Sequence, residues 1–100
     1  MMLTIQSINF EATDRLEGFI RSKVGKISGL HDRITDTKVY LKVEKNKSKD
    51  QGNKVVEMKV LAPNVTLHAS EQCRTFEEAA DLCVDQIRRQ LIKFKEKNRT

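Results

Sequence analysis

The chain has 100 residues, of which 38% are hydrophobic, with 19 Lys and Arg against 14 Asp and Glu and a formal net charge of +5. This is the size of one domain with its own core, no apolar run approaches the ~20 residues that span a bilayer, and the first ten residues lack the pattern of a signal peptide. Residues 86–100 contain six of the basic residues and one acid, so the first 85 residues hold 13 of each sign. A positive charge gathered at one end of the chain indicates a polyanionic partner.

The first predicted element is a strand over residues 3–10. Apolar side chains alternate at Leu3 and Ile5 and then shift phase to Ile8 and Phe10. A shift of this kind predicts a β-bulge near residue 6 or 7.

A helix is predicted next, with Thr13 or Asp14 as its N-cap and Gly29 as its stop signal. Its apolar residues recur at helical spacing and form one face. They are Leu16, Phe19, Ile20, Val24 and Ile27.

Three strands follow as a meander. Residues 37–43 alternate apolar and polar side chains, which is typical of a strand with one face in the core. After a polar loop over residues 45–53, alternation resumes in residues 56–60 and again in 65–69, with a tight turn at 62–64 between them.

A long second helix begins after Thr75, which has Glu78 three residues on as in a capping box. Its predicted core stripe is Phe76, Ala80, Cys83, Ile87, Leu91 and Phe94. The order is β-α-β-β-β-α. Because each helix has one apolar stripe and each strand one apolar face, we predict an α+β fold, a single domain over residues 1–100 with both helices on one face of a four-stranded sheet.

The second helix is acidic in its first half and basic in its second. Complementarity with the helix dipole accounts for this polarity but leaves the excess of five charges unexplained. On the helical wheel, Arg89, Lys93 and Lys97 share one flank of the stripe, and Arg88 and Lys95 share the other. Basic residues of the first helix would lie across a groove that follows a phosphate backbone.

Catalytic and metal-binding motifs are absent from the sequence. His31 and His68 have no ordered nucleophile to serve, and Cys73 and Cys83 lack metal-ligand spacing and are expected to be reduced thiols. Tyr40 is the single aromatic residue expected on the outer sheet face, so recognition of RNA backbone and shape is favoured over base reading. We expect no cofactor and no catalytic activity.

Several short segments match a known family in their order and spacing. They are residues 19–26, 32–34, 41–45, 67–70 and 89–97, together with Asp81. With the order of elements, these segments resemble the ribosome hibernation-promoting factor / ribosome-associated inhibitor A family, in its short form, and the similarity covers nearly the whole chain. Gln86 departs from the family pattern, in which lysine is common, and the absence of a long acidic tail favours the hibernation-promoting subtype.

The resemblance implies a cytoplasmic bacterial protein that binds the 16S rRNA of the small ribosomal subunit in the decoding channel. There it would silence translation in stationary phase or under stress. It implies no membrane and no small-molecule substrate, and we expect a monomer off the ribosome. The implied rRNA-binding residues, with Arg88 added from the wheel, are Lys23, Lys26, Arg33, Lys42, Lys45, Arg88, Arg89, Lys93, Lys95 and Lys97.

Two other functions remain compatible with the sequence. Helices on one side of a small sheet also occur in general double-stranded RNA-binding modules. A regulator that grips an acidic protein surface would use the same charges.

Overall fold

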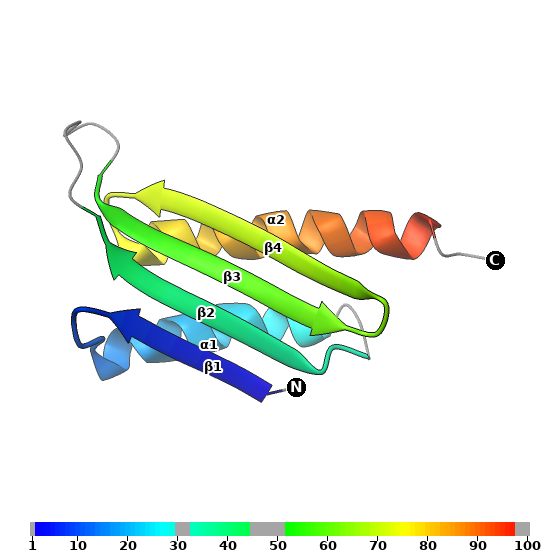
Figure 1. Cartoon of the computed structure of the whole chain (residues 1–100), viewed down its shortest axis with the longest axis horizontal. Coiled ribbons are helices and arrows are strands. Elements are labelled where there is room, and N and C mark those ends of the chain that lie inside the picture. Colours follow the sequence, from blue (N-terminus) through cyan, green and yellow to red (C-terminus); the bar gives the residue numbers. More distant parts are fainter. Residues whose placement is uncertain (1, 30–32, 45–51, 98–100) are drawn as a thin grey trace.

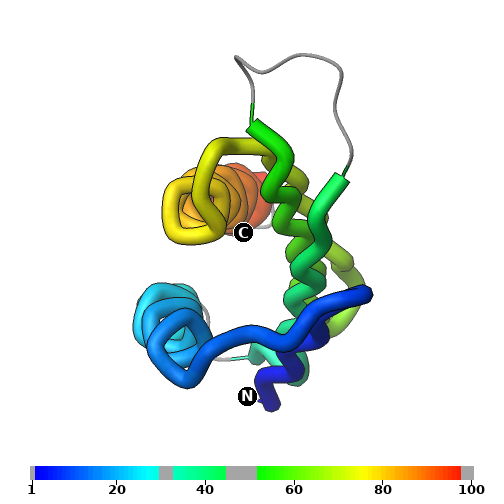
Figure 2. Tube along the Cα trace, turned by 90° about the vertical axis from the view of Figure 1, so that its left-hand side faces the viewer, coloured from blue at the N-terminus to red at the C-terminus, as the bar shows by residue number. Residues whose placement is uncertain are grey.

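Two helices lie side by side on one face of a four-stranded sheet in the computed structural model of the chain (Figure 1, Figure 2). The structure describes residues 2–29, 33–44 and 52–97. The predicted α+β class, element order and one-sided placement of the helices are confirmed. The elements are β1 (Met2–Ile8), α1 (Asp14–Ser28), β2 (Asp36–Val43), β3 (Lys54–Ala62), β4 (Val65–Cys73) and α2 (Phe76–Lys97).

The strands lie in the order β1-β2-β3-β4, and only the first pair is parallel. A parallel pair needs a crossover, which α1 supplies. The other three strands form the predicted meander. Pro63 and Asn64 make the turn between β3 and β4, where Asn64 takes the left-handed conformation with φ 66°.

The predicted β-bulge in β1 is wrong. The strand pairs with β2 in an unbroken register, and Leu3 and Ile5 alternate inward along it. The phase shift in the sequence has another cause. Asn9 adopts φ 64° and turns the chain out of the strand, after which Phe10 stacks on Phe76 with ring centroids 5.0 Å apart.

Both ends of α1 form as predicted. The Oγ1 of Thr13 accepts the Leu16 N–H at 3.1 Å, and Gly29 is the C-cap. A capping hydroxyl satisfies one of the N–H groups that a helix leaves unpaired in its first turn. The buried face is Leu16, Ile20, Val24 and Ile27.

The second helix is also capped as predicted, because the Oγ1 of Thr75 accepts the Glu78 N–H at 3.1 Å. Its stripe is buried from Phe76 to Leu91. The prediction that Phe94 belongs to the core is wrong, since this ring is only half-buried. Figure 1 shows the reason: α2 continues beyond the end of the sheet, so nothing in the sheet covers its last turns.

The core is a single layer between the sheet and the helices. The inward side chains of β2, β3 and β4 meet the buried faces of α1 and α2 there. The sheet contributes mainly Thr37, Val39, Leu41, Val56, Met58, Val60, Leu67, Ala69 and Cys73. Gly52 closes one end of the sheet with φ 75°, and a Cβ there would overlap the backbone of Cys73 and Arg74.

We expect Leu91→Ala and Phe94→Ala to differ in their effect on stability. Leu91 is 0% exposed, so its truncation should lower the free energy of unfolding by about 2–5 kcal/mol. Phe94 is half-buried, and its truncation should cost no more than about 2 kcal/mol. Urea denaturation followed by circular dichroism measures both. A larger loss of unfolding free energy for Phe94→Ala would show that the Phe94 ring belongs to the core.

Candidate nucleic-acid interface

A groove runs between the two helices, because α1 and α2 cover the same face of the sheet side by side (Figure 2). Its volume is about 240 Å³. Ile27 and Val84 are the apolar residues among those that line it. Charged side chains from both helices complete the lining: Lys23 and Lys26 from α1, and Asp81, Asp85 and Arg88 from α2.

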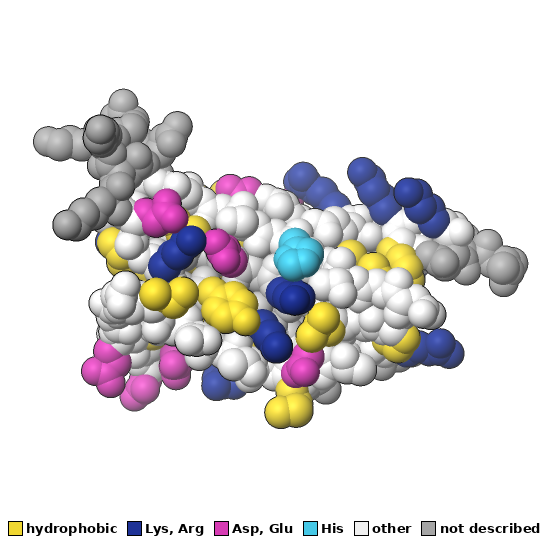
Figure 3. Space-filling view, viewed as in Figure 1, with side chains coloured by type: hydrophobic (Ala, Val, Ile, Leu, Met, Phe, Trp, Pro, Cys, Tyr) yellow, Lys and Arg dark blue, Asp and Glu magenta, His cyan; other side chains and the backbone are white. Residues whose placement is uncertain are grey.

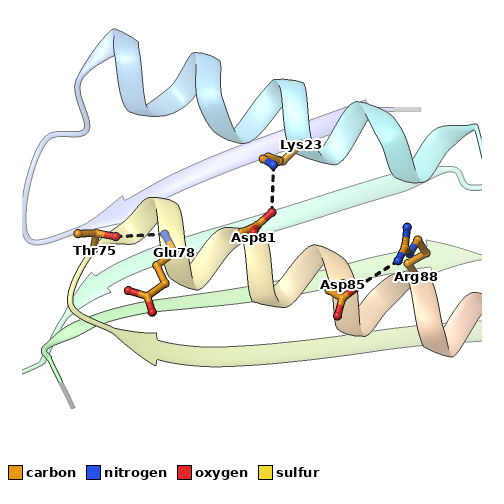
Figure 4. A network of polar contacts seen from close by, with 6 residues as sticks. All are labelled: Lys23, Thr75, Glu78, Asp81, Asp85 and Arg88. Carbon is orange, nitrogen blue, oxygen red and sulfur yellow. Dashed lines mark hydrogen bonds and ion pairs between the residues drawn. The ribbon is translucent and has the colours of Figure 1, made fainter. Parts of the chain in front are cut away.

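Carboxylates of α2 hold three of the predicted RNA-binding cations. Lys23 Nζ lies 3.0 Å from an Asp81 oxygen, across the groove, as Figure 4 shows. Asp85 pairs with Arg89 at 2.6 Å and with Arg88 at 3.4 Å. The groove is therefore a surface of mixed charge, in which cations and carboxylates alternate.

The ion pairs of Asp85 could have been predicted from the sequence, since residues three and four apart are neighbours on a helix surface. The pair between Lys23 and Asp81 was hidden, because it depends on how α1 lies against α2. All these side chains are at least partly exposed, so each pair contributes at most about 1 kcal/mol to stability.

Four predicted cations have no counter-charge in the described part of the chain. Within the ranges 2–29, 33–44 and 52–97, no carboxylate lies within ion-pair distance of Lys26, Lys93, Lys95 or Lys97, and all four side chains are exposed. Lys26 stands at the groove, and the other three occupy the last turns of α2. Figure 3 shows basic side chains gathered over this end of the helix, which extends past the sheet.

Lys42 lies apart from the helix cations, on the opposite face of the sheet. Its Nζ is 3.1 Å from Glu57 and 3.3 Å from Glu44. Hydrogen bonds to Glu57 and then to Glu44 raise the pKa of Lys42 above its usual value. Two carboxylates therefore compensate this predicted site residue.

The two remaining predicted residues belong to the connections. Arg33 is exposed in the segment that leads into β2. Lys45, like Lys47 and Lys49 in the same loop, lies outside the described residues.

The flank of α2 that faces β4 is fastened by amides. Gln90 Nε2 donates to the His68 carbonyl at 2.8 Å, and Gln86 Nε2 donates to Glu71. Gln86, the position where the family pattern favours lysine, thus binds the sheet.

Both cysteines are free and buried. The Cys83 thiol donates to the Val56 carbonyl at 3.3 Å, and burial raises its pKa to about 12. Burial, followed by the charges of Glu78 and Glu71, also raises the pKa of Cys73. Thiols held in the protonated form are poor nucleophiles at neutral pH.

The described residues show neither a metal-binding cluster nor a membrane-spanning helix. Residues 2–29, 33–44 and 52–97 contain no group of three or more His, Cys, Asp or Glu side chains placed to hold a metal ion. Neither helix in that part of the chain is long and apolar enough to cross a membrane.

The fold and the charged helices define a small basic α+β binding domain. Residues 3–99 match the family model described as Sigma 54 modulation protein / S30EA ribosomal protein, and the chain belongs to this family. The resemblance to ribosome hibernation-promoting factors is confirmed.

Two relatives are named ribosome hibernation promoting factor. The protein of Escherichia coli strain K12 is 33% identical over 97 residues, which cover 97% of this chain and 96% of the relative. That of Azotobacter vinelandii is 31% identical over 97 residues, covering 97% of this chain and 85% of the relative.

Two solved structures share the fold. A ribosomal subunit interface protein from Coxiella burnetii has a TM-score of 0.82 at 20% identity, covering 96% of this chain and 99% of the other. The N-terminal domain of Thermus thermophilus Protein Y has a TM-score of 0.79 at 22% identity, covering 94% and 99%.

We expect the protein to lose stability above pH 9. An unfolded Cys83 thiol ionises near pH 9.0, whereas the folded thiol keeps its proton until about pH 12. The stability that the protonated Cys83 thiol contributes is therefore fully present below pH 9. It is lost as pH rises from 9 towards 12, by up to about 1.4 kcal/mol per pH unit. Urea midpoints measured from pH 8 to 11 should fall more steeply for the unaltered protein than for Cys83→Ala. Parallel slopes would contradict this assignment.

Removing the groove carboxylates should strengthen polyanion binding. The double variant Asp81→Asn, Asp85→Asn releases three cations, so it should elute from a heparin column at higher salt than the unaltered protein. The matched control is Glu11→Gln, Asp14→Asn, which makes the same charge change at the start of α1. Equal elution of the two variants would mean that net charge alone sets the affinity.

Proposed function

We propose that the protein is a non-catalytic, cytoplasmic ribosome-associated factor. It binds the small ribosomal subunit through 16S rRNA, in the decoding channel, and silences translation in stationary phase or under stress. Family membership and the names of the relatives support ribosome association and a role in hibernation. The protein acts as a monomer off the ribosome and needs no cofactor.

The uncompensated lysines at the end of α2 carry this proposal. Lys93, Lys95 and Lys97 lie on both flanks of a helix that projects beyond the sheet, without acidic partners in the described part of the chain. Because no ion pair within the described residues holds these lysines, they can neutralise phosphates when RNA lies along the helix. Neutralisation releases counterions, which is the main source of affinity for nucleic acid backbone.

The paired cations bind RNA by exchanging partners. Lys23 and Arg88 line the groove, Arg89 follows Arg88 on α2, and Asp81 and Asp85 already hold all three. Because a surface ion pair is weak, a phosphate can replace the carboxylate at low cost, and the two arginines can bind phosphate oxygens with two hydrogen bonds each. Lys26, which makes no ion pair within the described residues, joins them.

The experiment compares two double variants of equal charge. Lys93→Glu, Lys97→Glu reverses two free cations at the end of α2. Arg21→Glu, Lys54→Glu makes the same change at the flank of α1 and the start of β3. The first pair should abolish co-sedimentation with small subunits and inhibition of translation in vitro, while the second should weaken both only modestly.

Salt dependence and competition complete the test. In charge-neutral variants, each lost phosphate contact should lower the slope of log affinity against log salt by about 0.7–0.9. Binding to small subunits should survive an excess of duplex RNA. Loss of binding in that competition would favour a general double-stranded RNA-binding module, and equal losses from the two charge-reversed pairs would reject the helical site.

A further inference from the structure

The outer face of the sheet, opposite the helices, carries a row of basic side chains. Strand register places Thr4 opposite Lys38, Lys38 opposite Lys59, and Lys59 opposite His68. The row therefore crosses the sheet at one level, with its basic side chains on β2, β3 and β4 and Thr4 on β1. Figure 3 shows the histidine side chain with Lys and Arg side chains beside it on this face.

The charges of this row do not stabilise the sheet. Like charges directly opposite one another on paired strands are destabilising, and Lys38 faces Lys59 in this way. Carboxylates are near, since Asp36 and Glu57 lie on the same face. Yet the side chains of Lys38, Lys59 and His68 make no ion pair or hydrogen bond within the described residues.

Lys42 on the same face shows the contrast. It is held by Glu57 and Glu44 and so belongs to a compensated cluster. The pairing also offsets the charge of Glu57, so that this carboxylate repels an incoming anion less strongly. The uncompensated cations lie two rows from Lys42 on the same face, beyond the row of Tyr40 and Glu57.

A hollow of about 360 Å³ lies against this row. Among its lining residues are Tyr40, Lys59, His68 and Ser70. Tyr40 pairs with Glu57, so it is the diagonal neighbour of Lys59, about 7–8 Å away along paired strands. The hollow thus combines an aromatic ring, two basic side chains and a hydroxyl, and Glu57, whose charge Lys42 offsets, also lines it.

We propose that this outer-face hollow binds one unpaired nucleotide of RNA. The base stacks on the Tyr40 ring, and the phosphate lies between the ammonium groups of Lys38 and Lys59, with His68 beside them. Stacking suits any base, because every base has a π-face. The inference rests on the proposed function, since it takes RNA as the partner, and it adds a second contact face, opposite the helices.

The chain offers a specific reporter, because Tyr40 is its only tyrosine and it has no tryptophan. NMR of protein with isotope-labelled tyrosine therefore observes one ring. Titration with a single-stranded uridine hexanucleotide should shift the ring signals upfield to saturation. Tyr40→Leu should weaken the affinity about tenfold, whereas Tyr40→Phe, which keeps the ring, should retain it.

Lysine variants test the phosphate position. Lys59→Ala should weaken hexanucleotide binding several-fold more than Arg21→Ala, which removes the same charge from an exposed position on α1. Equal effects of the two would overturn the proposal. A similar ring shift on adding inorganic polyphosphate, which has no base, would also overturn it.

One further variant separates this inference from the proposed function. Lys93→Glu, Lys97→Glu should lose small-subunit binding, yet its Tyr40 ring should still respond to the hexanucleotide. If Lys93→Glu, Lys97→Glu loses subunit binding but the Tyr40 ring of the unaltered protein does not respond to the hexanucleotide, the helical site is retained and the hollow is rejected. A responsive ring in a protein that never sediments with small subunits would support the hollow and reject the proposed function.

Discussion

A four-stranded sheet with one apolar face has room for two helices, and α1 and α2 both pack on that face. Each helix must turn its apolar stripe toward the sheet, which fixes its rotation about its own axis. The charged flanks of α1 and α2 then have to face each other across the groove. The arrangement of charge in this molecule is thus a consequence of core burial, because burial decides which side chains meet.

Burial also divides the cations into two groups. Where the helices lie over the sheet, carboxylates accompany several of the cations, as Asp81 accompanies Lys23 and Asp85 accompanies Arg89. Where α2 projects past the sheet, Lys93, Lys95 and Lys97 outnumber the single acid Glu96 and form no ion pair in the described part of the chain. Pairing of opposite charges near the core avoids repulsion between the packed helices. The last turns of α2 pack against nothing in the sheet, so like charges there cost little.

The sequence predicted the fold well because each element shows a clear period and begins or ends at a suitable residue. Thr13 and Thr75 cap the helices as their positions indicated. The errors arose where a local pattern met a tertiary boundary. Asn9 ends β1 earlier than alternation suggested, and Phe94 continues a helical stripe beyond the sheet that should bury it.

The candidate site was predictable as a charged region but not as a set of contacts. Helical spacing identified the basic end of α2. It could not show that Lys23 reaches Asp81, because that pair depends on the placement of one helix against another. The hollow at Tyr40 was also hidden, since it depends on strand register, which brings Lys59 diagonal to the ring only once β2 and β3 are paired.

Gly52 has a part in aiming the basic helix, although it is distant from that helix in sequence. Its α-carbon lies so close to the Cys73 carbonyl and the Arg74 nitrogen that no side chain fits between them. These two residues form the corner where the chain leaves β4, just before the Thr75 cap of α2. A methyl group at residue 52 would overlap this corner, and any outward shift of the corner would tilt α2. A small angular error at its first turn would then be magnified along 22 residues of rigid helix, displacing the lysines at the far end. A tolerated substitution at this glycine would therefore need a compensating movement, either of the corner or of residue 52 itself.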